Sequence, residues 1–373
     1  MPNASEICEV AAGGAQYRDW TNVSVTRRYG DWASSFSLAV AEPSGGAGSW
    51  AKIKLKPGDP VTIILAGNPV IRGFIEVRQA VIAARAHGVQ VQGRSKTGDL
   101  VSASAIIKPG EFKNYSFEAI AKKAIEPFGL QFKMQNPPDG AARPFKSVQV
   151  FHGETVFQFL ERLARQRGII CTDDKDGNLI GGSVKADAAP AADLEEGKNI
   201  FEARVIIRDD TVFSKIEGYS QDRGSDSAWG KDVSQIKVDA NNPTMNRYKP
   251  LILISEEPSS KKDLQDRVDR EQAQRIGTAV ECTVVVQGWL KPKGGLWKEG
   301  EVLNVKAPSL FPNSNGFQNL AVQSVTYLQD PHHGTTTSLE LVLPQALGVK
   351  FTQGPGGEAP NAFNPGNEQA NPA

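Results

Sequence analysis

The stretch VVVQGWLKPKGGLWKEGEVLNV, residues 284–305, decides the fold class of this chain. Cys282, Val284 and Val286 alternate on one side of the turn, Val302 and Val305 lie on the other, and apolar alternation with a period of two predicts half-buried strands. Gly294 and Gly295 allow the positive φ of a hairpin turn between the two strands. Trp289 and Trp297 are large enough to anchor a barrel or sandwich core. The stretch therefore predicts a β-hairpin that serves as scaffold, with no residue of catalytic type.

Composition limits the classes of function that the chain can have. The 42 Lys and Arg residues balance 42 Asp and Glu residues, and a net charge of zero argues against a dedicated nucleic-acid binder. Cys8, Cys171 and Cys282 lie far apart without a CxxC motif, which predicts neither a zinc site nor a disulfide framework and fits a reducing compartment. The start of the chain lacks the pattern of a signal peptide, and no apolar run approaches the roughly 18 residues of a membrane helix. We expect a soluble protein with no membrane insertion.

Changes of pattern divide the 373 residues into four parts. Residues 1–100 contain about six short apolar alternations separated by turn signals, which predicts a first β-barrel domain. Residues 101–190 predict an α+β module, and residues 191–347 return to β as a second β-barrel domain with one surface helix at about 260–276. Residues 348–373 are rich in Gly, Pro and Asn and predict a disordered tail. The expected fold is a β-rich α+β multidomain protein, with two small β-barrel domains and an α+β insertion module between them.

The central module carries a repeated pattern. Ser116 can cap a helix that stops before Gly129, and a second helix over residues 155–167 stops at Gly168. An extended run follows each glycine, so helix, stop glycine and strand occur twice. Residues 183–197 are small, polar and acidic, which predicts a linker or long loop.

Each candidate for chemistry has a better structural explanation. His332 and His333 are adjacent on a turn and point apart, so a solvated turn is favoured over half of a metal site. The run DDKDGN at residues 173–178 superficially resembles a calcium loop, but Lys185 stands where that loop needs a glutamate, which favours a hairpin turn. The run GRSKTG at residues 93–98 lacks the spacing of a phosphate loop. We expect no catalytic residue, no metal site and no cofactor.

Several motifs in order resemble a known family. They are GRSKTGDL at residues 93–100, Gly-Trp at 288–289 followed by Gly-Leu-Trp at 295–297, and Val-Thr-Tyr at 325–327 leading into a threonine-rich strand. Their combination resembles the baseplate hub proteins of Mu-like contractile-tailed bacteriophages, which are also similar to the base of type VI secretion spikes. The family-like positions in this sequence are Gly93, Arg94, Thr97, Gly98, Asp99, Trp289, Trp297 and Tyr327, and we expect them to be structural anchors.

The resemblance implies a mechanical function rather than catalysis. A hub of this family is a homotrimer in which each subunit contributes two barrel domains, so that six similar barrels form a ring. The ring would join the hexameric tail tube protein to the trimeric spike protein and leave a channel through which phage DNA passes without specific binding. The implied location is the baseplate of the virion tail, after assembly in the host cytoplasm.

An alternative function remains open, that of a cell-wall-active tail protein. Residues 149–169, QVFHGETVFQFLERLARQRGI, resemble the opening of a LysM peptidoglycan-binding motif. The competing explanation is that Gly153-Glu154-Thr155 is a good helix start, where polar groups satisfy free N–H groups. A muralytic enzyme would instead need a hidden pair of carboxylates, such as Glu154 and Glu161.

Overall fold

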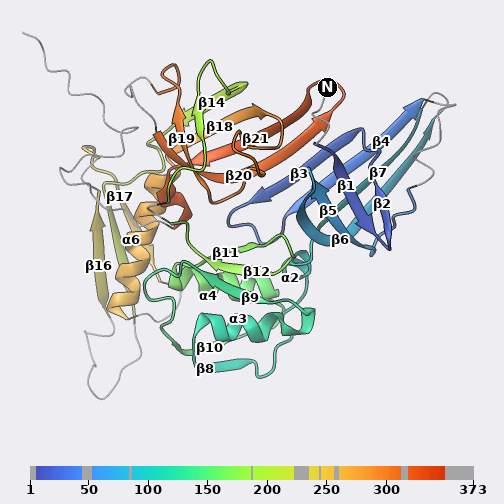
Figure 1. The fold of residues 1–373 in the computed structure, drawn as a ribbon. Coiled ribbons are helices and arrows are strands. Elements are labelled where there is room, and N and C mark those ends of the chain that lie inside the picture. Colours follow the sequence, from blue (N-terminus) through green and yellow to red (C-terminus); the bar gives the residue numbers. More distant parts are fainter. Residues whose placement is uncertain are drawn as a thin grey trace, which may run out of the picture.

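The computed structural model describes residues 6–43, 53–83, 86–185, 188–221, 235–242, 245–255, 260–311 and 318–348. The largest element among these residues is a 13-stranded sheet that contains strands from both ends of the chain (Figure 1). Its strands are β1 (Cys8–Ala12), β2 (Ala15–Tyr17), β3 (Asn22–Arg28), β4 (Ser35–Pro43), β5 (Pro60–Leu65), β6 (Asn68–Ala83), β7 (Ala86–Ser95), β13 (Asp193–Glu195), β14 (Glu202–Ile207), β18 (Val280–Gln287), β19 (Val302–Lys306), β20 (Gln318–Asp330) and β21 (Gly334–Val342).

The strand order is β14-β18-β21-β20-β3-β4-β7-β6-β5-β1-β2, with β19 and β13 attached beside β20. The N-terminal and C-terminal β regions meet where β3 pairs antiparallel with β20, with Val25 opposite Tyr327. Within the described residues the sheet stays open and neither region closes into a barrel, so the prediction of two barrel domains is wrong in this respect. The physical reason is that β3 and β20 satisfy each other's backbone groups, and neither strand is left to close its own region.

Alternation along the strands explains how the sheet forms its core. In β3, Val23 and Val25 are buried, while Ser24 and Thr26 lie on the other face. Side chains of a strand point alternately to the two faces, so one face of the whole sheet is apolar. Most of the buried apolar residues of both β regions form one hydrophobic cluster. The β regions are therefore one packing unit, although the central module separates them in sequence.

The stretch over residues 284–305 is β-rich, but it does not form the predicted hairpin. Its first strand, β18, pairs with β14 and β21, and its second, β19, pairs with β20 and β13. The glycine pair does make a tight turn, with φ of +87° at Gly294 and +78° at Gly295, but the turn closes only a short bridge between Leu290 and Leu296. The reason is that the loop folds back into the core, where both of its tryptophans are buried.

The central module has its own hydrophobic cluster. It consists of α2 (Gly98–Ser102), β8 (Glu111–Tyr115), α3 (Phe117–Ile125), η1 (Glu126–Phe128), β9 (Phe132–Gln135), β10 (Phe145–Gln149), α4 (Val156–Arg167), β11 (Ile170–Asp173) and β12 (Leu179–Gly182). The predicted repeat is confirmed: Gly129 and Gly168 both adopt the left-handed conformation, and strands β9 and β11 follow them. Strand β12 pairs with both strands, parallel to β9 and antiparallel to β11.

A further three-stranded sheet has the order β16-β15-β17, with β15 (Lys215–Ser220), β16 (Ile236–Asn241) and β17 (Pro250–Ile254). Helix α6 (Lys261–Gly277) lies along this sheet (Figure 1) and buries Leu264 and Val268 against it. The predicted surface helix exists, but it is not only an outer cover. Arg143 of the central module forms an ion pair with Asp263 of α6 at 2.6 Å, so the helix also holds the central module. The charged residues of α6 that suggested a solvated face therefore include one that contacts the central module.

The segment predicted as an acidic linker contains strand β13, which pairs parallel with β19 and buries Leu194 completely. A polar composition did not reveal this strand because only one of its side chains faces the core. The last described element is η2 (Pro344–Leu347), and most of the tail predicted to be disordered lies outside the described residues. None of the helices in the described ranges is both long and apolar enough to span a membrane.

Candidate functional site

The family-like residues near the end of the first β region lie at a tight crossing of strands. A Cβ atom added at Gly93 would lie 2.0 Å from the backbone oxygen of Phe74 and 2.6 Å from the Phe36 ring, so only glycine fits there. The Arg94 guanidinium next to it donates to both carboxylate oxygens of Glu76, with Nε–Oε1 at 2.9 Å.

The rest of that segment turns into α2. Thr97 is fully buried, and its hydroxyl lies 2.8 Å from the hydroxyl of Ser95. Gly98 begins the helix, and Asp99 in its first turn is exposed, with its backbone oxygen accepting from the N–H of Ala103. These residues make the connection from the large sheet to the central module.

The three aromatic positions lie together in the core of the large sheet. Tyr327 donates its hydroxyl hydrogen to the backbone oxygen of Trp297. Trp289 donates from its indole nitrogen to the backbone oxygen of Leu328 at 3.0 Å, and its backbone N–H donates to the Glu6 carboxylate at 2.6 Å. The structure thus brings Trp289, Trp297 and Tyr327 together. The segment 93–99 contributes to a different part of the molecule.

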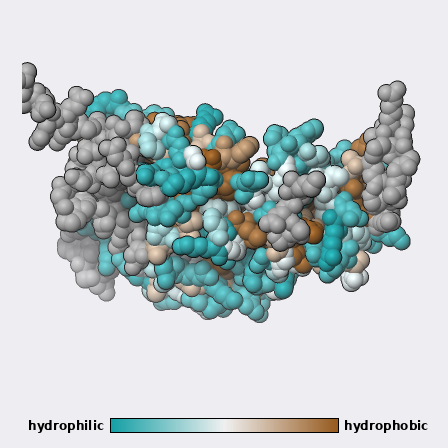
Figure 2. All heavy atoms as spheres, turned by 45° about the horizontal axis from the view of Figure 1, so that its top comes forward, coloured by the Kyte–Doolittle hydropathy of each residue, from teal (hydrophilic) through white to brown (hydrophobic). Residues whose placement is uncertain are grey.

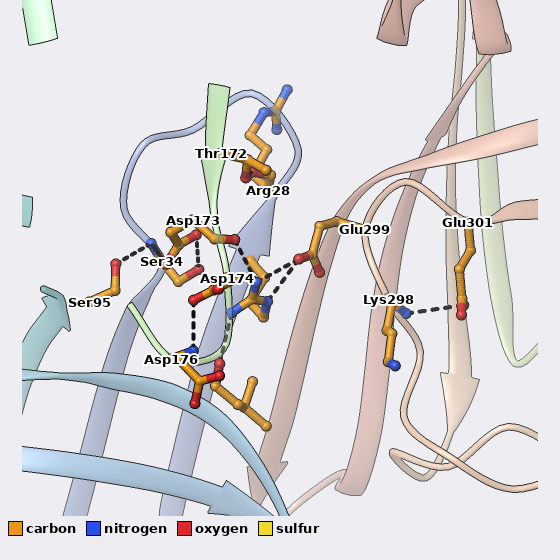
Figure 3. Close-up of polar contacts among 12 residues, drawn as sticks. Arg28, Ser34, Ser95, Thr172, Asp173, Asp174, Asp176, Lys298, Glu299 and Glu301 are labelled. Carbon is orange, nitrogen blue, oxygen red and sulfur yellow. Dashed lines mark hydrogen bonds and ion pairs between the residues drawn. The ribbon is translucent and has the colours of Figure 1, made fainter. Parts of the chain in front are cut away.

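Ser95 of this segment lies in a buried polar junction that holds three regions of the chain together (Figure 3). Arg27 of β3 is only 7% exposed, and its guanidinium donates to the Glu299 carboxylate at 2.6 and 2.9 Å. It also donates to the backbone oxygens of Val70 at 2.7 Å and Asp173 at 3.0 Å. One side chain therefore contacts the N-terminal β region, the central module and the C-terminal β region.

Asp173 continues the junction on its other side. Its carboxylate accepts from the hydroxyl of Ser34 at 2.7 Å and from the backbone N–H of Ser34 at 3.1 Å, and Figure 3 shows Ser34 and Ser95 beside it. Burial raises the pKa of the Asp173 carboxyl above its ordinary value, and this outweighs the Arg27 charge and the serine hydrogen bonds, which lower it. For Arg27, burial lowers the pKa, but the carboxylates of Glu299 and Asp173 outweigh burial and raise it.

Sequence reasoning missed this junction, although one signal was present. Arg27 occupies the position after Val23 and Val25 in the alternation of β3, and that position faces the core. A charged residue is almost never fully buried unless it is paired, so its place in the pattern implied a partner. The partner Glu299 is 272 residues away, and no pattern in the sequence connects them.

The structure gives structural roles to the other candidates for chemistry. The carboxylate of Asp174 accepts from the backbone N–H groups of Asp176 and Asn178, as expected for a tight turn rather than a calcium loop. Among the described residues, no group of three or more His, Cys, Asp or Glu side chains is arranged to hold a metal ion. His333 lies 3.1 Å from Asp330 on an exposed turn.

The predicted carboxylate pair is not held as a pair. Glu154 accepts from the backbone N–H of Phe151 at 2.6 Å and contacts Arg162, while Glu161 accepts from the Trp32 indole at 3.3 Å. The hydroxyl of Thr155 accepts from the N–H of Gln158 in a capping box, which confirms that the Gly-Glu-Thr sequence is a helix start. Burial raises the pKa of Glu161, outweighing its hydrogen bond from Trp32 and the charge of Arg165.

A groove of about 860 Å³ runs between the loop at residues 28–31, the central module and α6. Its lining mixes basic with acidic side chains, including Arg165 and Arg270 beside Glu161 and Asp269. A groove with both signs of charge has no preference for a charged ligand of one kind, so it does not define a substrate class.

The large sheet has a polar face on the side opposite the core. The paired register places hydroxyl and amide side chains on this face from six strands. They include Ser24, Thr26, Ser37, Gln90, Gln92, Thr283, Thr326 and Ser338. At the junction of the two β regions, the hydroxyls of Thr26 and Thr326 lie 3.1 Å apart.

Two family models match consecutive parts of the chain. "Mu phage baseplate assembly protein GpP-like, N-terminal" matches residues 7–95, and "Baseplate hub protein gp44-like, second domain" matches residues 97–182. The baseplate hub protein gp44 of Escherichia phage Mu is 28% identical over 339 residues, which cover 90% of this chain and 88% of that protein.

Solved structures agree with these matches. The 43 kDa tail protein of prophage MuSo2 from Shewanella oneidensis is 27% identical, with a TM-score of 0.78 over 92% of this chain and 100% of that one. A type VI secretion component of E. coli, c3393, described as similar to the phage T4 tail proteins gp27 and gp5, shares the fold at a TM-score of 0.54 and 11% identity, over 92% of this chain and 79% of that one. Taken together, these likenesses show that the chain is similar over most of its length to the baseplate hub proteins of Mu-like phages.

Proposed function

We propose that this chain is a trimeric adaptor without catalytic activity, which joins a hexameric tail tube to a trimeric spike and leaves a channel for DNA. The observation that carries the proposal is the single sheet that joins both β regions through β3 and β20. Two β regions in each of three subunits give six, which matches the symmetry of a hexameric tube while keeping the threefold symmetry of a spike. Assembly in the host cytoplasm and incorporation into the baseplate of the virion belong to the same proposal.

The buried junction supports an adaptor because it makes the subunit rigid. Arg27 joins three regions of the chain through hydrogen bonds in a site with little access to water. Such bonds are electrostatically stronger than exposed ones, and breaking one leaves a buried charge without a partner. A part that transmits force between a tube and a spike needs regions that do not move separately.

The polar face of the sheet is suited to line the proposed channel. Its neutral hydroxyl and amide groups do not attract phosphate strongly. Two of its arginines are held in ion pairs, since Arg28 contacts Glu340 and Arg94 contacts Glu76. Unpaired Lys and Arg would release counterions from DNA and hold it in place. This face would therefore let DNA pass without binding it specifically.

The first test is the native mass of the purified chain, measured by light scattering on a sizing column. A trimer should have a mass three times the 40.2 kDa of the chain. Adding the tail tube protein of the same phage should then nucleate tubes that electron microscopy detects, and adding the spike protein should give a stable complex. A monomer at every concentration, even with the spike protein present, would contradict the proposal.

A peptidoglycan pull-down tests the alternative of a wall-active protein. Binding that is lost in Thr155→Ala and Glu154→Ala variants would favour that alternative. We expect no binding, because these two residues are used to build the start of α4.

A further inference from the structure

Several strand edges of the large sheet are open among the described strands, and two of them, those of β14 and β6, carry large apolar side chains. Strand β14 is the last strand at one end and pairs only with β18 among the described strands. Strand β6 pairs with β7 along its length but with β5 only as far as Phe74, so within the described residues the outer edge of 76–83 faces no strand. Strand β14 lies near the top of Figure 1 and β6 at its right. Beyond β6 the sheet continues through β5 and β1 to β2.

Both edges expose large apolar side chains. Ile82 of β6 is 74% exposed, and Val77 and Val81 are about half exposed. Phe201, directly before β14, is 71% exposed, and Ile207 at the end of β14 is also exposed. An open edge with apolar side chains is a template for pairing with another chain, and natural proteins cover such edges or protect them with charge. Hydrophobic residues reach the surface in several patches on the face that Figure 2 shows.

We propose that β14 of one subunit pairs with residues 76–83 of β6 in the next subunit. This inference rests on the proposed trimer and names its interface. The occupant of each edge is a second copy of this chain, because each copy supplies both edges. A head-to-tail contact of this kind is heterologous, and it closes into a ring when the rotation between copies allows it.

The number of strands in each subunit supports closure of the subunits into a ring. The path from β14 to β6 contains eight strands, β14-β18-β21-β20-β3-β4-β7-β6, and every neighbouring pair in it is antiparallel. Because eight is an even number, β6 runs opposite to β14. A copy rotated about the ring axis therefore presents its β14 antiparallel to β6, which continues the alternation without interruption. Three copies would close a ring of 24 strands.

The faces of the two strands restrict the register. On β6, Arg78 and Ala80 lie opposite the buried Val91 and Val89, so the even-numbered residues of this segment are on the core side. On β14, Ala203 and Val205 lie opposite the buried Val284 and Cys282, so there the odd-numbered residues are on the core side. A shift of one residue would turn every side chain to the wrong face. Core-side residues of one strand must therefore pair with core-side residues of the other.

Among the allowed registers, one brings the most exposed side chains together. It places Ile82 opposite Phe201, which also puts Ala80 opposite Ala203 and Val77 opposite Ile206. Directly opposed residues in an antiparallel pair have Cβ atoms about 4.5–5.5 Å apart. Cysteines at Ala80 and Ala203 would then be close enough to form a disulfide after a small adjustment.

Disulfide cross-linking of the full chain tests the interface. The double variant Ala80→Cys/Ala203→Cys should form covalent dimers and trimers under mild oxidation, seen on a denaturing gel without reductant. Ala80→Cys/Val205→Cys tests the register shifted by two residues, and Ala80→Cys/Arg204→Cys, with its cysteines on opposite faces, is the matched control. The native cysteines Cys8, Cys171 and Cys282 are buried, so they should not contribute.

A second measurement uses single substitutions and native mass. Ile82→Asp should convert the trimer to monomer, because a carboxylate at the seam cannot be solvated there. Ile106→Asp is the control, since Ile106 is 82% exposed in the central module and lies outside the proposed seam. A native trimer in which neither same-face pair cross-links and Ile82→Asp remains trimeric would overturn the β14–β6 interface while leaving the trimer intact. A wild-type monomer would overturn the trimer itself.

Discussion

Replacing Arg27 with methionine should destabilise the protein by about 3–5 kcal/mol, because it breaks a buried ion pair and leaves the carboxylate without its partner. Methionine keeps much of the apolar stem, so the change removes mainly the charge and the hydrogen bonds. The guanidinium makes two contacts with Glu299 and one each with the backbone oxygens of Val70 and Asp173. Two neutral backbone acceptors account for roughly 1 kcal/mol each, and the stranded carboxylate accounts for the rest.

A double-mutant cycle separates the pair from the packing. The side chain of Glu299 is only 13% exposed, so water can compensate for little of its lost partner. Adding Glu299→Gln to Arg27→Met removes the stranded charge, so the double variant should be more stable than the sum of the single changes predicts. We expect a coupling energy of about 1–3 kcal/mol, which is within the range found for residues in direct contact.

Urea unfolding followed by circular dichroism measures these differences as shifts of the midpoint. A heat scan should show Arg27→Met melting roughly 6–10 °C below the wild type, since a large domain shifts by about 2 °C for each kcal/mol. Two results would refute the reasoning: an Arg27→Met variant within about 0.5 kcal/mol of the wild type, or single changes that add without coupling. Either would mean that the junction does not hold the regions together.

Three further predictions concern other parts of the fold. First, the pKa of Asp173 is raised in the folded state above the ordinary carboxyl pKa of about 3.9. The contribution of Asp173 to folding stability is therefore fully present below about pH 3.9 and is lost as the pH rises through the folded pKa. The stability of the wild type relative to Asp173→Asn should therefore increase as the pH is lowered from 7 to 4 (urea unfolding at each pH), and a constant or decreasing difference would contradict the sign. Second, Gly93→Ala should cost at least about 1–3 kcal/mol through overpacking, whereas Gly110→Ala, which has no atom within 4 Å of its added Cβ, should cost little, and equal melting temperatures would show that the strand crossing can relax. Third, Thr155→Ala should cost about 1 kcal/mol by removing the cap of α4, while Thr155→Ser should retain most of it; equal unfolding midpoints for the two variants would argue against a capping role.

The local elements followed from the sequence because their signals act over a few residues. Ser116 and Thr155 cap the two central helices as predicted, and Gly129 and Gly168 end the helical segments in the left-handed conformation. Hydrogen bonds between a side chain and the next turn do not depend on the remainder of the chain. The alternation of β3 likewise predicted a strand, with a buried and a polar face.

The pairing of strands could not be predicted from the sequence in the same way. Residues 284–305 contain a turn that favours a hairpin, yet β18 and β19 do not pair with each other. Both strands find partners that come from distant segments, because burying the apolar face of a 13-stranded sheet outweighs the local preference of one turn. Burial of this shared apolar face also explains why the two β regions form one open sheet instead of the two expected barrels.

The sequence by itself determined the β-rich class, the positions of the central helices and the resemblance to the hub family. Only the tertiary structure decided that β3 pairs with β20, that Arg27 contacts Glu299 across 272 residues, and that two apolar strand edges remain open. The physical reason is one of range. Caps, turns and alternation are fixed by neighbours in the chain, whereas strand order and buried charge pairs depend on which distant surfaces exclude water together.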